Sequence, residues 1–204
     1  MVAAGCVSLM AWPGSGRSQG VYFNTEIGAA LADEVKWKEF FGPTDGSKFE
    51  FDTGVRFGGS CGYNFNRYLA IEGETGFIYN SFKNLDASLA HVPLMVNVVV
   101  RYDVPRCKWV PYAGVGGGAD LSIITLDNVA GNGVITEGTD STSTWAWQAF
   151  AGVRYRFNRN MSAGLGYKYY SVDSASWDFA GYNDSIKIGQ ANVHSILLEF
   201  NMKF

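Results

Sequence analysis

NVHSILLEFNMKF, residues Asn192–Phe204, shows the pattern from which the fold class of this chain can be predicted. One set of alternate positions is large and mostly apolar: His194, Ile196, Leu198, Phe200, Met202 and Phe204. The positions between them are mostly polar: Ser195, Leu197, Glu199, Asn201 and Lys203. Because successive side chains of a β-strand point to opposite faces, this alternation predicts a strand that lies between an apolar and a polar environment.

The composition favours strands over helices. The chain has 204 residues, enough for one domain with a core, and it contains 25 glycines, 15% aromatic residues and only 17% charged residues. This combination suits closely packed strands. A formal net charge of −3 and a pI of about 5.4 do not indicate the excess of positive charge that is typical of nucleic-acid-binding proteins. No apolar run of roughly 18 residues occurs, which excludes a transmembrane helix, whereas a closed barrel can still cross a membrane.

Residues 1–19 differ from the rest and predict a signal peptide or a disordered N-terminus. An apolar stretch is followed by Pro-Gly-Ser-Gly at residues 13–16, and small residues precede Gln19, as a signal peptidase prefers. The signal is incomplete, because no Lys or Arg precedes the apolar stretch. Residues 20–204 are expected to form one β-barrel domain.

Three cysteines cannot all pair with one another. Cys6 is expected to leave with the signal peptide. Cys61 and Cys107 fall near the same end of two predicted strands that are not neighbours, so a disulfide and two free thiols both stay open.

The alternation of the last strand recurs seven times upstream. These predicted strands span residues 21–31, 49–58, 69–79, 92–102, 109–123, 145–157 and 161–169. Short turns are expected at residues 64–67, 103–106 and 158–160, and longer loops at residues 33–47, 80–90, 125–144 and 173–190. Short and long connections therefore alternate, as in an all-β, eight-stranded antiparallel up-and-down transmembrane β-barrel with its loops outside the cell. The last strand must pair with the first to leave no edge in lipid.

Aromatic residues gather at both ends of the predicted strands. At the turn end they are Tyr68, Tyr102, Trp109, Phe157 and Phe204, and at the loop end Tyr79, Trp145 and Tyr169. Two such girdles are typical of the interfaces between lipid and water. A soluble lipocalin-like carrier is an alternative barrel, but the apolar faces of the second to seventh strands carry no charge, as lipid requires.

The polar faces of these strands predict a charge network inside the barrel. The acids are Glu26, Glu50, Asp52, Glu72, Glu74, Asp120 and Glu199, and the bases are Arg56, Arg101, Arg154, Arg156, Lys168 and Lys203. Since the two signs nearly balance and eight strands leave room for little beyond side chains, the network is expected to fill the lumen. A narrow or gated porin is the alternative, although a selective pore more naturally shows an excess of one sign. Arg154 with Glu72 or Glu74 is the expected centre of the network.

Several segments resemble a known family when their order and spacing are taken together. They are residues 92–97 (VPLMVN), 111–118 (PYAGVGGG), 152–157 (GVRYRF) and 166–169 (GYKY), followed by the terminal Phe204. Over residues 20–204 the chain resembles the OmpA-like, opacity-type outer-membrane β-barrel family. Glu199 departs from the family pattern, which has a small residue at that place. Nothing in the chain resembles the peptidoglycan-binding domain that follows the barrel in OmpA proper, so no cell-wall anchoring is expected.

The resemblance implies a monomeric protein of the outer membrane of a Gram-negative-type bacterium, with a structural or adhesin-like role and no cofactor. The last strand also resembles the insertion signal of such barrels, carried here by Ile196, Leu198, Phe200, Met202 and Phe204. The implied partners are outer-membrane lipid and lipopolysaccharide, the barrel-assembly machinery, and a host or surface ligand of the loops.

Catalysis is the contrasting possibility, because some eight-stranded barrels of this membrane act on the acyl chains of lipid A. His194, Ser195 and Glu199 are the residue types of a hydrolase triad, but adjacent residues of a strand point to opposite faces. The sequence therefore predicts no catalytic residue, and it shows no metal or cofactor motif. His91 precedes its predicted strand and is expected at the rim or in a loop.

The loops are expected to hold whatever is specific to this protein. Their aromatic residues either contact a partner or fold back on the barrel rim: Trp37, Phe40, Phe41 and Trp177.

Overall fold

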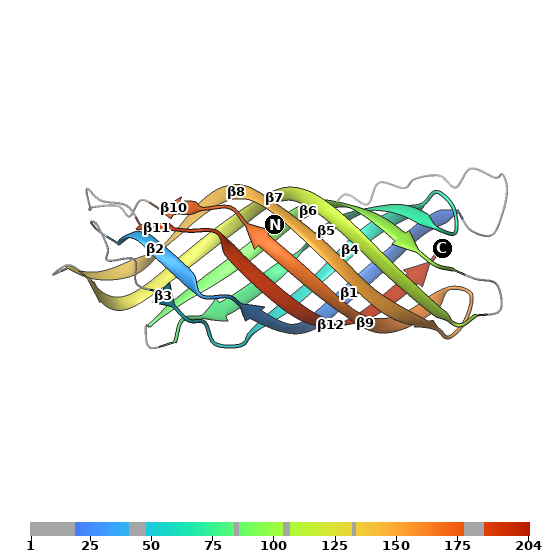
Figure 1. The fold of residues 1–204 in the computed structure, drawn as a ribbon, viewed down its shortest axis with the longest axis horizontal. Helices are drawn as coiled ribbons and strands as arrows, with labels where there is room; N and C mark the ends of the chain where they lie inside the picture. Colours follow the sequence, from blue (N-terminus) through green and yellow to red (C-terminus); the bar gives the residue numbers. More distant parts are fainter. Residues whose placement is uncertain (1–18, 41–47, 84–85, 104–106, 132–133, 178–185) are drawn as a thin grey trace, which may run out of the picture.

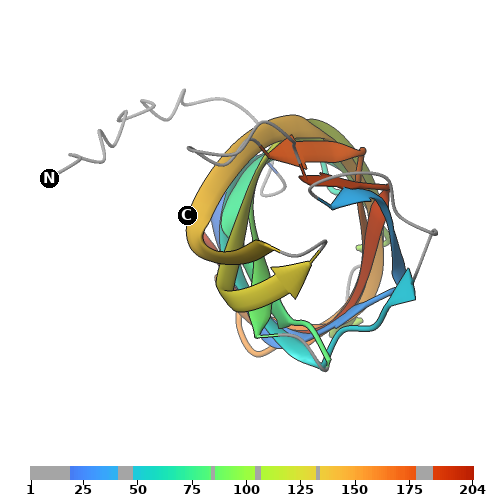
Figure 2. The same ribbon diagram turned by 90° about the vertical axis from the view of Figure 1, so that its left-hand side faces the viewer.

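Eight antiparallel strands close into a barrel in the computed structural model of the chain (Figures 1 and 2). The structure describes residues 19–40, 48–83, 86–103, 107–131, 134–177 and 186–204. The barrel strands are β1 (Gly20–Ala32), β4 (Gly54–Asn64), β5 (Leu69–Ser81), β6 (Ala87–Arg101), β7 (Trp109–Gly131), β8 (Val134–Arg156), β9 (Met161–Val172) and β12 (Ala191–Lys203). Their order around the barrel is β1-β12-β9-β8-β7-β6-β5-β4, which confirms the predicted up-and-down barrel. Residues 1–18 of the predicted signal peptide, which include Cys6, lie outside the described residues, and so does Phe41.

The first and last strands form the closing seam, as the sequence predicts. β12 pairs with β1 from Lys203 opposite Tyr22 to Val193 opposite Ala32. The backbone amide of Phe204 also donates to the carbonyl of Val21 at 3.0 Å. The seam gives both strands a neighbour on each side, so the barrel wall has no open edge there.

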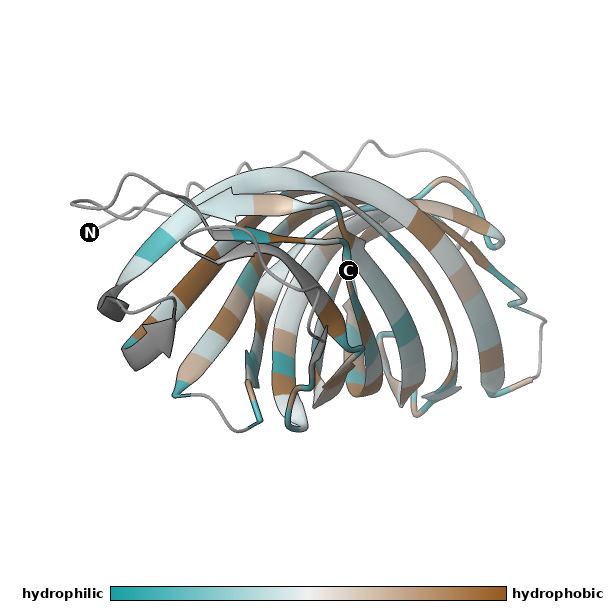
Figure 3. Cartoon of the chain, turned by 60° about the vertical axis from the view of Figure 1, so that its left-hand side comes forward, coloured by the Kyte–Doolittle hydropathy of each residue, from teal (hydrophilic) through white to brown (hydrophobic). Residues whose placement is uncertain are grey.

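Side chains alternate between the two faces of the barrel wall and appear as alternating brown and teal bands along the ribbon in Figure 3. Large apolar side chains cover the outside, with Leu94 68%, Ile27 62% and Leu198 62% exposed. The predicted girdle residues also include highly exposed rings, such as Trp145 and Tyr102. The outer surface is thus the one that lipid requires. Within the described ranges, no helix is long and apolar enough to cross a bilayer.

The longest hairpin of the barrel corrects the prediction of a loop at residues 125–144. β7 and β8 have 23 residues each and pair continuously except for one irregularity between Leu126 and Val129. About ten residues suffice to cross a bilayer, so the hairpin extends well beyond the membrane. Its far end projects past the other strands at the left of Figure 1. The alternation in fact continues into this segment, where Leu126 is buried and Asp127 is exposed, but its many Gly, Asn and Ser residues are typical of loops.

A second, four-stranded sheet lies at the same end of the barrel and corrects two further loop predictions. It consists of β2 (Val35–Phe40), β3 (Lys48–Phe49), β10 (Ala175–Trp177) and β11 (Ile186–Ile188), in the order β10-β11-β2-β3. Residues 33–47 and 173–190 therefore contain short strands. The predicted second barrel strand, residues 49–58, begins only at Gly54, because Phe49 belongs to β3 and Phe51 forms an isolated bridge with Phe82. Seen from the loop end in Figure 2, this sheet lies along one side of the barrel mouth.

An apolar cluster at the loop end of the barrel joins buried side chains of this sheet to side chains of the barrel strands. Its buried members are Val35, Phe51, Phe82, Ala87, Leu89, Ile124, Leu126, Ala175, Trp177, Ile188 and Ala191. Trp177 is 2% exposed, and its indole nitrogen donates to the backbone carbonyl of Ser122 at 3.1 Å. Of the two predicted placements for this loop tryptophan, the structure shows the one that folds back onto the barrel.

The two cysteines of the barrel are free thiols. Cys61 lies on β4 and Cys107 lies just before β7, and both are exposed. The possibility of a disulfide between them is therefore excluded in this structure.

Candidate functional site in the barrel lumen

A cluster of four charged side chains crosses the middle of the lumen. The Arg56 guanidinium lies 3.0 Å from Glu26 and 2.9 Å from Glu74. The Lys168 ammonium lies 2.9 Å from Glu26 and 2.6 Å from Glu74. Two acids and two bases thus neutralise one another, and all four side chains are almost fully buried. Fully paired charges are the form in which a low-dielectric interior tolerates ions.

Two amides extend the central cluster to the opposite wall. The Asn97 amide donates to Glu74 at 2.7 Å, and the Gln148 amide donates to the same carboxylate at 2.8 Å. Gln148 also donates to the Asn97 carbonyl oxygen at 2.8 Å. Side chains from β1, β4, β5, β6, β8 and β9 therefore meet in one hydrogen-bonded layer, which leaves little room for a water column.

A second polar layer lies nearer the turn end, and it corrects the predicted partner of Arg154. The Arg154 guanidinium pairs with Glu199 at 2.9 Å and stacks on the Tyr112 ring at 4.1 Å, rather than pairing with Glu72 or Glu74. The Tyr112 hydroxyl donates to Glu199 at 2.5 Å. Sequence alone could not choose among these acids, because the pairing depends on how the strands are staggered around the barrel.

The resemblance predicts a small residue at position 199, and glycines on the neighbouring strand make room for the glutamate that stands there. Gly164 lies directly opposite Glu199 on β9. At Gly166, a Cβ atom would lie 2.6 Å from a Glu199 carboxylate oxygen and 2.7 Å from the Tyr112 hydroxyl. The space that a larger residue would take on β9 is therefore occupied by the Glu199 carboxylate and its tyrosine partner.

A third polar layer lies toward the loop end and contains a histidine whose predicted position was wrong. His91 is 3% exposed inside the barrel, not at the rim, and its Nδ1 lies 2.8 Å from Asp120. The hydroxyls of Ser122 and Tyr170 donate to the same carboxylate at 2.5 Å and 2.7 Å. The alternation of β6, when it is extended backward from Asn97, places His91 on the inward face. This pattern in the sequence would have predicted the position of His91 correctly.

Two of the predicted lumen acids lie outside the lumen. Glu50 and Asp52 are exposed, because they precede the barrel strand β4. Glu50 pairs with Lys83 on the surface at 3.0 Å, and this hydrogen bond raises the pKa of the Lys83 ammonium. An exposed pair of this kind contributes little to stability.

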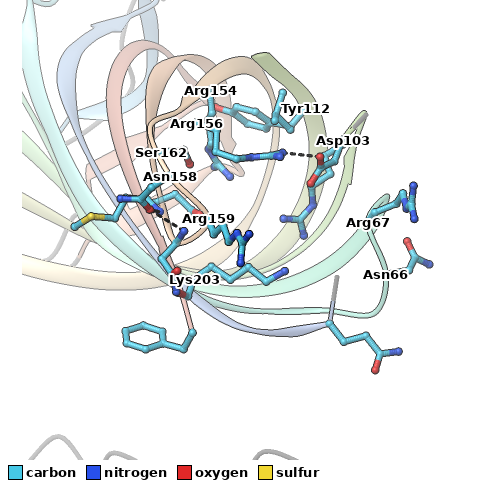
Figure 4. A pocket seen from close by; sticks show the side chains of 17 residues that line it. Asn66, Arg67, Asp103, Tyr112, Arg154, Arg156, Asn158, Arg159, Ser162 and Lys203 are labelled. Atoms are coloured by element: carbon cyan, nitrogen blue, oxygen red, sulfur yellow. Dashed lines mark hydrogen bonds and ion pairs between the residues drawn. The ribbon is translucent and has the colours of Figure 1, made fainter. Parts of the chain in front are cut away.

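The turn end of the lumen opens into a basic vestibule with a volume of about 510 Å³ (Figure 4). Its bases are Arg67, Arg101, Arg154, Arg156, Arg159 and Lys203. Asp103 is the only acidic side chain among its described lining residues, and it pairs with Arg156 at 2.5 Å. Three bases that the sequence assigns to the lumen network, Arg101, Arg156 and Lys203, therefore line this mouth, away from the central cluster.

The residues of the contrasting hydrolase hypothesis do not come together. Ser195 points inward and is fully buried, whereas His194 lies on the outer face, where its ring nitrogen is 2.5 Å from the Tyr167 hydroxyl. Glu199 is held by Arg154 and Tyr112. Nor do the described residues contain a group of three or more His, Cys, Asp or Glu side chains that could hold a metal ion.

The residues of the predicted insertion signal form the outer face of β12. Ile196, Leu198, Phe200 and Phe204 are exposed, and Met202 is half-buried. The Phe204 ring packs edge-on against Phe23 of β1, with ring centroids 5.7 Å apart.

Comparison with known proteins identifies the class that this architecture defines. The family model of the outer membrane protein beta-barrel domain matches residues 1–204, so the chain belongs to this family of bacterial outer-membrane proteins. A search of curated protein sequences finds no significant match to the chain.

Solved outer-membrane barrels share the fold. The outer membrane protein OprG of Pseudomonas aeruginosa is 16% identical, with a TM-score of 0.62 over 93% of this chain and 98% of that one. Neisserial surface protein A is 15% identical, with a TM-score of 0.58 over 91% and 97%. AlkL, solved in lipid bilayers, is 16% identical, with a TM-score of 0.54 over 97% of each chain. At these identities the likeness concerns the fold.

Proposed function

We propose that this outer-membrane protein is a non-enzymatic, non-conducting barrel that presents a rigid extracellular extension for interactions at the cell surface. The observation that carries the proposal is the presence of two buried side-chain clusters along the lumen, which we infer act as barriers to ions. One is the central cluster of Glu26, Arg56, Glu74 and Lys168. The other is the apolar cluster around Trp177 at the loop end.

The two barriers oppose ion flow for different physical reasons. An ion that enters from the turn end meets a layer of paired charges, whose separation leaves buried ions unpaired and costs several kcal/mol, roughly 3–5. An ion that enters from the loop end meets the apolar cluster, which offers no ligand to replace its water shell. Neither barrier resembles a ring of charges of one sign, which a selective pore would more naturally have.

The extension beyond the membrane supports a role at the cell surface. Loops of outer-membrane barrels lie outside the cell, which places the β7–β8 hairpin and the four-stranded sheet there. The hairpin is a paired ribbon whose exposed side chains include the hydroxyls of Thr139, Ser141 and Ser143. A stiff polar ribbon lets a partner bind with little ordering cost. Outer-membrane lipopolysaccharide and a host surface are the partners that we consider for it.

Planar-bilayer recording tests the closed lumen. The purified barrel should give no steady current at low voltage, and neither should a variant in which residues 127–137 are replaced by an Asn-Gly turn, because that variant keeps Leu126 of the apolar cluster and its partner Gly138. Steady ion-selective current through the unmodified barrel would refute the proposal in favour of a narrow porin.

The surface role is tested with the same shortened variant. Cells that express the full hairpin should attach to immobilised lipopolysaccharide or to host matrix proteins more than cells with the shortened one, at equal amounts of folded barrel. Equal attachment by both would show that the hairpin is not the interacting surface. Mass spectrometry of lipid A with and without expression tests the enzymatic alternative.

A further inference from the structure

The basic vestibule at the turn end carries more positive charge than its structure neutralises. Arg156 pairs with Asp103, and Arg154 pairs with Glu199. Arg67, Arg101 and Arg159 make no ion pair with any acid in the described part of the chain. The excess concentrates a positive field in a cavity with low-dielectric walls, and such a field attracts anions.

Arg101 is the innermost of these three guanidinium groups. Its side chain lies over the Tyr22 ring at 5.2 Å and donates one hydrogen bond to the Asn64 side chain. Its Nε is buried and makes no hydrogen bond within the described protein. Because Arg101 lines the vestibule, the N–H groups at the end of its guanidinium can donate to an acceptor that a ligand brings.

The three guanidinium groups come from different parts of the mouth. Arg67 belongs to the β4–β5 turn, Arg101 ends β6, and Arg159 belongs to the β8–β9 turn. In Figure 4 the Arg159 side chain extends into the mouth, while Arg67 lies at its opposite rim. One ligand that reaches all three must carry several acceptor oxygens in a compact volume. Planar guanidinium forks match the oxygens of phosphate groups.

We propose that this vestibule is a binding site for a phosphate-bearing polyanion on the periplasmic side of the outer membrane. A cavity of about 510 Å³ has room for a ligand of the size of a triphosphate or a phospholipid headgroup. The two sources share the same chemistry. Phe204 and Met161 at the mouth would contact the acyl chains of a lipid, whereas a soluble polyphosphate would touch the basic residues alone. The site does not depend on the closure of the loop end.

Isothermal titration with tripolyphosphate, on the full barrel in a zwitterionic detergent at low ionic strength, tests the site. We expect one binding event that weakens with added salt. Arg101→Gln and Arg159→Gln should each weaken it about tenfold, because each removes a charge-assisted hydrogen bond. Lys83→Gln, which removes an exposed base at the other end of the barrel, is the matched control and should leave affinity unchanged. Heat modifiability on gels confirms that each variant is folded.

Nanodiscs distinguish the two sources of phosphate. If an anionic phospholipid occupies the site, barrels in phosphatidylglycerol nanodiscs should bind tripolyphosphate more weakly than barrels in phosphatidylcholine nanodiscs, and Arg101→Gln should abolish that difference. If the ligand is soluble, the arginine dependence should persist in both. The proposal is overturned if tripolyphosphate does not bind in detergent or phosphatidylcholine, or if the Arg101→Gln/Arg159→Gln double variant binds as the unmodified protein does.

Discussion

Glu199 points into the lumen from the last strand, and its surroundings explain how a carboxylate fits there. Arg154 neutralises it, Tyr112 donates to it, and Gly166 leaves the space for it. The sequence shows that an acid points inward at this position, but the identity of its partner depends on three strands at once. Composition and alternation therefore predict well which side chains point into the lumen. They predict less well which of those side chains bind one another.

Removing the Glu199 charge should leave Arg154 buried without an acid. We expect Glu199→Gln to lower the free energy of unfolding by about 3–5 kcal/mol, since breaking one half of a buried pair is costly. Urea unfolding in lipid vesicles measures the loss. The control is Glu50→Gln, which removes an exposed acid and should cause no measurable loss. If the Arg154→Met/Glu199→Gln double variant is no more stable than Glu199→Gln alone, the unpaired charge is not the cause.

Trp177 should be the largest single contributor to the apolar cluster. We expect Trp177→Ala to cost about 3–5 kcal/mol, because it leaves a cavity and removes the hydrogen bond to the Ser122 carbonyl. The same unfolding measurement applies. Trp145→Ala is the matched control, because Trp145 is 63% exposed on the outer face of the same end. Equal losses for both variants would mean that the cluster does not close this end of the barrel.

At the scale of elements, strands that cross lipid were predictable and those beyond it were not. The alternation of β12 continues without interruption because lipid and lumen impose opposite demands on its two faces. β2, β10 and β11 are only six, three and three residues long, too short for a period-two pattern to stand out. They form through pairing between segments far apart in the chain, which local sequence does not reveal.

The last strand should be required for assembly of the barrel in the membrane rather than for an activity. Deleting Phe204 removes the ring that packs on Phe23 and the amide that bonds to Val21, both at the turn end of the seam. We expect several-fold less heat-modifiable barrel in outer-membrane fractions. Phe57→Ala, which removes an exposed aromatic ring from β4, should assemble normally. Normal amounts of folded barrel without Phe204 would contradict an insertion signal at this end.

At the scale of the whole molecule, the lumen is organised in layers that differ in chemistry from one end to the other. The loop end is apolar, the middle is a neutral set of ion pairs, and the turn end is basic. The near balance of acids and bases in the sequence predicted a filled lumen but not this separation. Only the structure shows that Arg101, Arg156 and Lys203 gather at one mouth.

The two barriers should act in series on ion flow. Trp177→Ala alone should not produce steady current in planar bilayers, because the central cluster still blocks the lumen. An Arg56→Ala/Glu74→Ala variant should also stay closed, because the apolar cluster remains. Only the combination of the three substitutions should conduct, with folding verified by heat modifiability. Current through either partial variant would show that the barrier kept in that variant does not block ions by itself.

The register of the closing seam also bears on the order of events during folding. Glu26 lies directly opposite Glu199 across β1 and β12, so two carboxylates approach each other when the seam forms. The cations that separate their charges come from β4, β8 and β9: Arg56, Arg154 and Lys168. If these strands had not yet taken their places, the approach would be repulsive. We therefore expect the other barrel strands to pair with their neighbours first. The pairing of β1 with β12 is expected to be the last step of folding.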